Sequence, residues 1–283
     1  MPRFVKLLPS SLLLAMPVAY LALGETIVLI TGEVDLSLGS ALMLVNAVTV
    51  SAHTDFGVDG FLFIFTPLAV GIFIGMIHGI LICYGRLNSF LTTVGTSFVW
   101  GGLALVILGE PRGKVPVWFS EAFLGDLGGV PIGFWALILA LAIWLAFYLS
   151  PFALSFYAVG GTAKAAYSLG LNVNRVKFYA FIINGFLAGL AGLIMTGIIG
   201  SGDPRLGALS TILAVLAALL GGAHFSGGRG NGFGAIMAAI GLQFARNLVA
   251  WAGITYYLLD LVYGAIIVSL IALISFFRRK VEA

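Results

Sequence analysis

The chain has 283 residues, of which 61% are hydrophobic and only 9% are charged, and its mean hydropathy is +1.13. A soluble globular protein needs more surface charge than this, so the composition excludes that class and predicts a polytopic membrane protein. The net charge of +3 is small, and basic residues in loops and at the C-terminus indicate membrane orientation and not nucleic-acid binding.

Apolar runs long enough to cross the hydrocarbon core, about 20 residues, recur along the chain. We predict spans at 10–31, 61–84, 88–109, 132–151, 178–199, 232–252 and 257–277. Two more apolar segments, 38–52 and 208–222, have about 15 residues and are short for a span. The predicted fold is all-α: one transmembrane domain over residues 1–283, a helical bundle of about nine spans with two short or broken helices.

Basic loops set the predicted orientation, because Lys and Arg resist translocation. Arg86, the basic loop at 155–178 and the C-terminal Arg278–Lys280 should be cytoplasmic, which places the 110–131 loop outside. Counting back from Arg86 puts the N-terminus outside, although its basic residues weakly favour the inside. Three explanations stay open: a preceding helix absent from this chain, a re-entrant 38–52 segment, or an external N-terminus.

The stretch Gly32–Ser40 reads GEVDLSLGS and precedes the first short segment. Glycines on both sides permit unwound backbone, which inside a membrane must be buried or line a cavity. Asp35 can also simply cap the following helix, its carboxylate accepting backbone N–H groups. Both interpretations stay open.

A similar stretch precedes the second short segment. Ile30–Gly39 reads ITGEVDLSLG and Ile198–Gly207 reads IIGSGDPRLG, so that Ile, Gly, Asp, Leu and Gly coincide at a constant offset. The predicted orientation puts Asp35 near the cytoplasmic face and Asp203 near the external one. This arrangement is typical of an inverted-topology repeat, with halves at about 10–109 and 178–277.

The loop at 155–178 is too polar to cross a bilayer, and it carries three basic residues and no acidic one. Within it, residues 163–169 are predicted to form a short helix, because Ala165 and Ala166 favour a helix and Gly170 ends it. A short surface helix between two spans offers a cytoplasmic partner a docking point. An ordinary connecting loop is the alternative.

Polar residues near the middle of the 232–252 span are costly in a bilayer and should face the bundle interior or a water-filled path. Arg246 could instead belong to a buried structural pair, with Glu25 as its nearest candidate counter-ion by charge. Together with the two loop motifs, these positions supply our candidates for a translocation path: Glu33, Asp35, Ser37, Asn46, Asp203, Gln243, Arg246 and Asn247.

The sequence offers no constellation for catalysis or metal binding. Its three histidines are scattered, and its single cysteine, Cys83, excludes an intrachain disulfide. It contains no G-x-x-x-x-G-K-[ST] motif, so it lacks the Walker A loop that cradles phosphates. We expect no cofactor in this chain; if ATP drives the protein, a separate subunit binds ATP and Mg²⁺.

Three of these stretches resemble one family. Gly160–Gly170 is similar to the coupling-loop signature of ABC importer permeases, Glu-Ala-Ala followed by three residues and Gly, in the form found in ribose/galactose-type sugar permeases. Here Thr162, Ala163 and Lys164 replace the usual Asn, Pro and Glu. Gly32–Ser40 resembles the family's Gly-Gly-Ile-Asp-Leu-Ser-Val-Gly-Ser, with Glu33 in place of the second Gly. The run at 213–234 resembles the family's Ala-Val-Val-Leu-Gly-Gly followed by Gly-Gly-x-Gly.

The resemblance implies a permease subunit of an ABC importer, a multi-pass protein of the inner or plasma membrane that is not itself an enzyme. Two permeases, identical or homologous, would form the path in the lipid bilayer. An extracytoplasmic solute-binding protein would deliver a simple sugar or similar small polar solute. Family members usually carry one more N-terminal helix, which favours the first explanation above. Two ATPase subunits would dock on residues of the coupling loop: Gly160, Gly161, Lys164, Ala165, Ala166 and Gly170.

Two other classes stay open on the residues alone. A gradient-driven secondary transporter would couple H⁺ or Na⁺ through intramembrane acids; Glu25, Asp35 and Asp260 are available but not clustered. A passive channel would need no ATPase partner. Co-purification with an ATPase separates the importer from both.

Overall fold

The computed structural model describes residues 3–207 and 209–251, together with 258, 261–262, 264–265 and 268–269. The chain divides into two compact units, Met1–Ile240 and Gly241–Ala283. The packing described below is that of the first unit.

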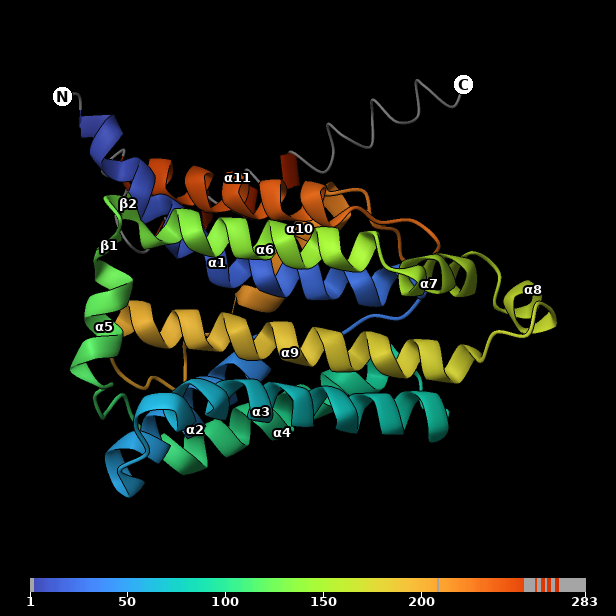
Figure 1. The fold of residues 1–283 in the computed structure, drawn as a ribbon, viewed down its shortest axis with the longest axis horizontal. Coiled ribbons are helices and arrows are strands. Elements are labelled where there is room, and N and C mark those ends of the chain that lie inside the picture. The colour runs from blue at the N-terminus through green and yellow to red at the C-terminus, as the bar shows by residue number, and fades with distance from the viewer. Residues whose placement is uncertain are drawn as a thin grey trace. The chain divides into compact units, whose positions relative to one another are not determined.

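The elements follow the predicted spans closely (Figure 1). In chain order they are α1 (Arg3–Ile30), α2 (Leu38–Phe56), α3 (Gly60–Gly79), the π-helix η1 (Ile80–Tyr84), α4 (Ser89–Leu108), α5 (Val117–Leu124), β1 (Asp126–Leu127), β2 (Val130–Pro131), α6 (Ile132–Tyr148), α7 (Pro151–Gly161), α8 (Ala163–Ser168), α9 (Val173–Ile199), α10 (Ser210–Leu220) and α11 (Gly232–Trp251).

Among the described residues, five helices are long and apolar enough to cross a membrane: Ser11–Ile30, Gly60–Tyr84, Ser89–Leu108, Val173–Ile199 and Gly232–Ala250. The pair α6 and α7 makes a sixth candidate, but the two helices meet at 74°. The multi-pass membrane class is confirmed, whereas the predicted count of nine spans is not confirmed by the described residues. The predicted span at 257–277 lies outside the continuously described residues.

The helix boundaries differ from the prediction where local backbone chemistry decides. The segment predicted at 38–52 extends to Phe56, because Gly57 adopts a left-handed conformation and its N–H caps the carbonyl of His53. The helix predicted to end at 151 stops at Tyr148, because Pro151 lacks an N–H and instead occupies the first position of α7.

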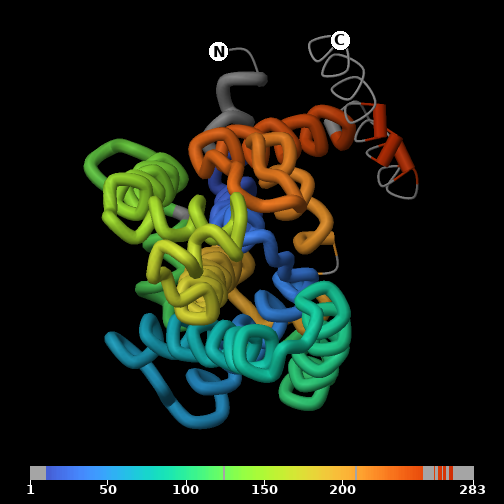
Figure 2. The backbone as a smooth tube through the Cα atoms, turned by 90° about the vertical axis from the view of Figure 1, so that its right-hand side faces the viewer, coloured from blue at the N-terminus to red at the C-terminus, as the bar shows by residue number. Residues whose placement is uncertain are grey.

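Helices α1 and α9 form the centre of the first unit and lie side by side in both views (Figures 1 and 2). In the apolar stretch of α1, 89% of the residues are buried within the protein. Small residues let α9 approach α3 closely: a Cβ on Gly71 would lie 2.2 Å from the Gly185 carbonyl oxygen, and one on Gly189 would lie 2.6 Å from that of Pro67. Close packing through small residues is the usual basis of helix association in bilayers.

The 110–131 loop is more structured than predicted. It contains α5 and a two-stranded hairpin in which Asp126 pairs with Pro131 and Leu127 with Val130, so the all-α prediction misses this small sheet. Phe119 anchors α5, because its buried ring packs edge-to-face on Phe63 at a centroid distance of 4.9 Å. The loop is therefore fixed to the ends of the helices.

Candidate functional site

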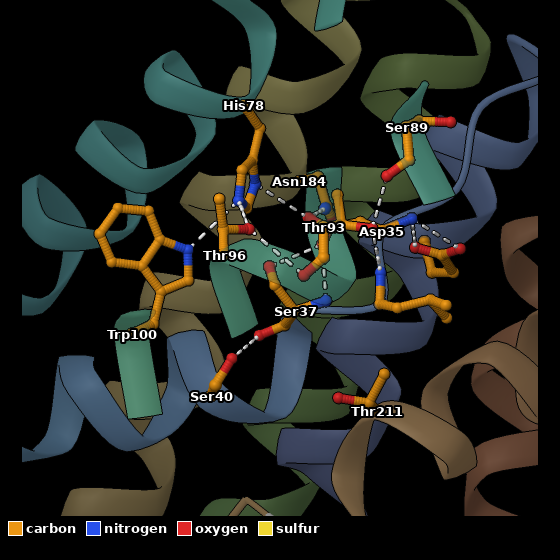
Figure 3. A network of polar contacts seen from close by, with 12 residues as sticks. Asp35, Ser37, Ser40, His78, Ser89, Thr93, Thr96, Trp100, Asn184 and Thr211 are labelled. Carbon is orange, nitrogen blue, oxygen red and sulfur yellow. Dashed lines mark hydrogen bonds and ion pairs between the residues drawn. The ribbon is translucent and has the colours of Figure 1, made fainter. Parts of the chain in front are cut away.

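A buried polar cluster surrounds Asp35 in the segment between α1 and α2 (Figure 3). Its Oδ1 accepts hydrogen bonds from the Ser37 backbone N–H at 2.8 Å and the Ser37 hydroxyl at 2.6 Å. Its Oδ2 accepts one from Asn184 Nδ2 of α9 at 2.8 Å. A carboxylate in an apolar interior is tolerated only with such partners.

His78 of α3 completes the cluster from the other side. Its Nε2 lies 2.8 Å from the Thr96 hydroxyl and receives the indole N–H of Trp100 at 3.2 Å. The other ring nitrogen of His78 is Nδ1. That nitrogen faces Asp35 Oδ2 at 3.3 Å, a long contact for a hydrogen bond.

Glu25 of α1 adjoins the cluster. Its fully buried carboxyl oxygens lie 3.2 and 3.3 Å from the backbone nitrogen of Asp35. The expectation that Glu25 and Asp35 are not clustered is therefore wrong: the segment after α1 folds back against its own helix. The suggested pairing of Glu25 with Arg246 stays a prediction.

The second motif, Ile198–Gly207, is held by a different residue. Asn46 of α2 donates to the Thr196 hydroxyl at 2.8 Å and to the Ser201 carbonyl at 3.2 Å, and it accepts the backbone N–H of Asp203 at 2.8 Å. The Asp203 carboxylate accepts the N–H of Arg205 at 2.9 Å. Asn46 and Asp203 therefore lie together, as parts of one hydrogen-bonded loop.

The two motifs, Ile30–Gly39 and Ile198–Gly207, touch at their equivalent last glycines. A Cβ on Gly39 would lie 2.1 Å from the Gly207 carbonyl oxygen, and one on Gly207 would lie 1.9 Å from that of Gly39. The Gly39 N–H also donates to Thr211 at 2.7 Å. Only glycine allows this approach, so both loops need it at the same place in their motif.

The path candidates fall into separate groups. Asp35, Ser37 and Asn46 are buried and hydrogen-bonded, and Glu33 pairs with Lys177 of α9 at 2.5 Å. In the second unit, Gln243 donates to Asn247 at 3.2 Å, one turn along α11. That these residues, with Asp203 and Arg246, line a solute path stays a prediction.

A glycine junction fixes the base of the loop at 155–178. A Cβ on Gly160 would lie 1.7 Å from the Ile30 carbonyl oxygen, and the Gly228 N–H donates to that same oxygen at 2.9 Å. The Tyr157 hydroxyl bonds the Gly230 carbonyl at 2.7 Å. Nothing lies within 4 Å of a Cβ on Gly161. Gly160, near the end of α7, therefore packs against the last residue of α1.

The predicted short helix is confirmed as α8, which lies beyond the ends of α7 and α9 (Figure 1). Ala166 faces inward and is buried, whereas Lys164 and Ala165 are exposed. Gly170 ends the helix in a left-handed conformation, φ +85°. Tyr167 and Leu169 are 74% and 80% exposed, on a helix that lies outside the candidate membrane spans. Beside this helix end lies a groove of about 760 Å³ lined by Tyr167, Ser168 and residues 170–174.

At the other end of α9, the 110–131 loop pairs with the second motif, Ile198–Gly207. Arg112 and Gly202 exchange two backbone hydrogen bonds of 3.0 Å. The Arg112 guanidinium also binds both carboxylate oxygens of Asp55 at 3.1 Å, which lowers the pKa of that carboxyl; the Ser51 hydroxyl lowers it further. Trp118 donates to Asp59 at 2.9 Å and lowers its pKa in the same way.

Sequence reasoning missed several partners of the predicted residues. His78 and Asn184 are polar residues inside apolar spans, a signal that identifies them as worth examining but not as partners of Asp35. Thr93, which accepts the N–H of Leu36 at 3.0 Å, and Trp100 carry no such signal. Across the described residues, no group of three or more His, Cys, Asp or Glu side chains is placed to hold a metal ion.

Comparisons with known proteins agree on one family. The family described as "Branched-chain amino acid transport system / permease component" matches residues 7–271. The chain is 30% identical over 248 residues to the ribose import permease protein of Haemophilus influenzae, covering 84% of this chain and 76% of that protein. It is 33% identical over 257 residues to the ribose import permease protein of Bacillus subtilis, covering 89% and 80%.

The D-allose transport system permease protein of Escherichia coli is 30% identical over 258 residues, covering 89% of this chain and 78% of that protein. No solved structure matches the chain.

Proposed function

We propose that this chain is the permease subunit of an ATP-driven ABC importer. The premise is its family: the chain belongs to the branched-chain amino acid transport system permease family. The proposed solute is a simple sugar or a similar small polar molecule, because the similar proteins include ribose and D-allose permeases. The chain itself would not hydrolyse ATP. ATP and Mg²⁺ would bind to the partner ATPase, in keeping with the lack of a Walker A sequence here.

The observation that carries this proposal is α8. Tyr167 and Leu169, at the end of this short helix, are largely exposed beside a groove, and the long apolar helix α9 begins directly after it. Large exposed apolar side chains mark protein interaction sites. We therefore place the docking of the ATPase on α8 and the groove, with Lys164, Ala165 and Gly170 at its edge.

The other partners complete the proposal. A solute-binding protein would dock at the opposite end of α9, where α5 and the hairpin lie. A second permease, identical or homologous, would complete the path, and the C-terminus would be cytoplasmic. We also propose that the chain is an inverted repeat, because the two motif loops lie toward opposite ends of α9 and meet at the equivalent Gly39 and Gly207.

The test is association with the ATPase. The tagged chain is co-expressed with a candidate ATPase subunit, and the complex is purified and its affinity measured. We expect Tyr167→Ala and Leu169→Ala each to weaken association about thirtyfold, because exposed anchors of this kind can contribute about 2 kcal/mol. Val117→Ala, which changes a similarly exposed residue on α5, serves as the matched control. Unchanged affinity in both α8 variants would place the docking surface elsewhere.

A gradient-driven transporter is the second candidate, and the adjoining buried acids Glu25 and Asp35 favour it. Such a protein would accumulate solute in liposomes under an ion gradient with no ATPase present. If the chain associates with no ATPase and transports in this assay, the importer proposal is wrong and Glu25 becomes the residue to substitute.

A further inference from the structure

Helix α9 holds the segment 31–37 at two points. Lys177 Nζ lies 2.5 Å from Glu33 Oε1, and Asn184 Nδ2 lies 2.8 Å from Asp35 Oδ2. Lys177 and Asn184 are about two helical turns apart, so both side chains project from the same face of α9. Glu33 and Asp35 are alternate residues of the segment, and its two acids therefore bind one helix face.

The same helix is joined directly to α8. Only residues 169–172 separate the two helices, and Asn172 caps α9 by accepting the Arg175 N–H at 3.0 Å. From Val173 to Ile199 the helix contains no proline. A displacement of α8 is therefore passed to Lys177 through a short capped connection and little more than one turn of helix.

The ion pair is well placed to carry such a displacement. Glu33 and Lys177 side chains are 16% and 21% exposed, so solvent and salt screen their attraction less than that of a surface pair. Gly32, with φ +81°, turns the chain directly before Glu33. Beyond Glu33 the segment leads to the Asp35 cluster and to the contact between Gly39 and Gly207.

We propose that Glu33 and Lys177 are positioning residues that couple movement of α8 to the segment 31–37, and so set how much solute is moved per ATP hydrolysed. This inference rests on the proposed importer function. The Asp35 cluster anchors the same segment independently through Asn184 and His78. Loss of the ion pair should therefore weaken coupling while the fold and ATP hydrolysis persist.

The experiment uses the complete transporter, with its ATPase and binding protein, reconstituted in vesicles in which solute uptake and ATP hydrolysis are measured together. We expect Glu33→Gln and Lys177→Gln each to lower solute moved per ATP about fivefold, the lower range of typical coupling between sites. ATP hydrolysis should stay within about twofold of wild type, because coupling between two sites need not change a kinetic parameter such as the ATPase rate. The exchanged pair, Glu33→Lys with Lys177→Glu, should restore at least half of the lost ratio.

Arg175→Gln is the matched control, because it removes an equal charge from an exposed position in the first turn of α9. It should leave the ratio unchanged. An unchanged ratio in both single variants would overturn the coupling role, and so would an exchanged pair that restores nothing. Wild-type vesicles that show no ATP-dependent uptake would instead refute the importer function, and the coupling role with it.

Discussion

At the scale of single residues, the carboxylate of Asp35 organises the interior of the first unit. Ser37, Asn184 and His78 surround it from three different elements, each buried. Gly24 makes room for this arrangement, because a Cβ there would lie 2.3 Å from Asn184 Oδ1. A buried carboxylate that loses a donor bears the cost of desolvation without compensation.

Asn184→Leu, which keeps the branching and the number of side-chain heavy atoms but removes the donor, should destabilise the protein by about 2 kcal/mol. The measurement is the thermal unfolding midpoint of the purified protein in detergent. Asn174→Leu, at an exposed position of the same helix, is the control and should leave the midpoint nearly unchanged. Equal midpoints for the Asn184 variant and wild type would show that Asp35 does not depend on this donor.

The ion pair between Asp55 and Arg112 predicts a pH dependence of the 110–131 loop. Arg112 holds the pKa of Asp55 below its usual value, so the pair is complete above the unfolded-state pKa, about 3.9. It is lost as the pH falls through the lower folded-state value. The loop should therefore stay paired with Gly202 between about pH 5 and 8 and open only in strong acid.

Hydrogen–deuterium exchange at the amides of Arg112 and Gly202, corrected for intrinsic rates, measures this opening. Asp55→Asn should expose both amides at neutral pH and remove the acid transition. Glu110→Gln, on the same loop, should leave the transition in place. A loop that opens equally in wild type and in the Asp55 variant at pH 7 would show that the backbone pairing alone holds it.

At the scale of elements, glycines decide where helices and loops meet. The end of α7 contacts the end of α1 only because Gly160 brings no side chain toward the Ile30 carbonyl. The neighbouring Gly161 faces open space at the same helix end. The two adjacent glycines therefore differ. Gly160 is required for helix packing, whereas the space beside Gly161 could hold a side chain.

Gly160→Ala should therefore displace α7 and α8 and cost roughly 1–3 kcal/mol, the usual range for overpacking. Gly161→Ala, at a position with no atom within 4 Å of the added methyl group, should be neutral or slightly stabilising, since alanine favours a helix. The measurements are the thermal unfolding midpoint of each variant and its affinity for the ATPase subunit. Equal effects of the two substitutions would contradict the packing role of Gly160.

At the scale of the whole molecule, the long apolar helices connect the two ends of the first unit. One end carries α8, the glycine junction and the ion pair of Glu33 with Lys177. The other carries α5, the hairpin and the pairing of Arg112 with Gly202. Helix α9 runs between them and contacts both motif loops, so a movement at one end can reach the other through packed, hydrogen-bonded structure.

The sequence by itself determined the membrane class, most of the spans and the short helix α8. These depend on local properties: the length of an apolar run, the helix preference of Ala165 and Ala166, and the stop at Gly170. Only the tertiary structure decided which polar residues meet. Asp35 and Asn184, or Glu33 and Lys177, are far apart along the chain, and their contact follows from how α1, α3 and α9 pack. Helix packing depends on side chains from several elements at once, so no local pattern encodes it.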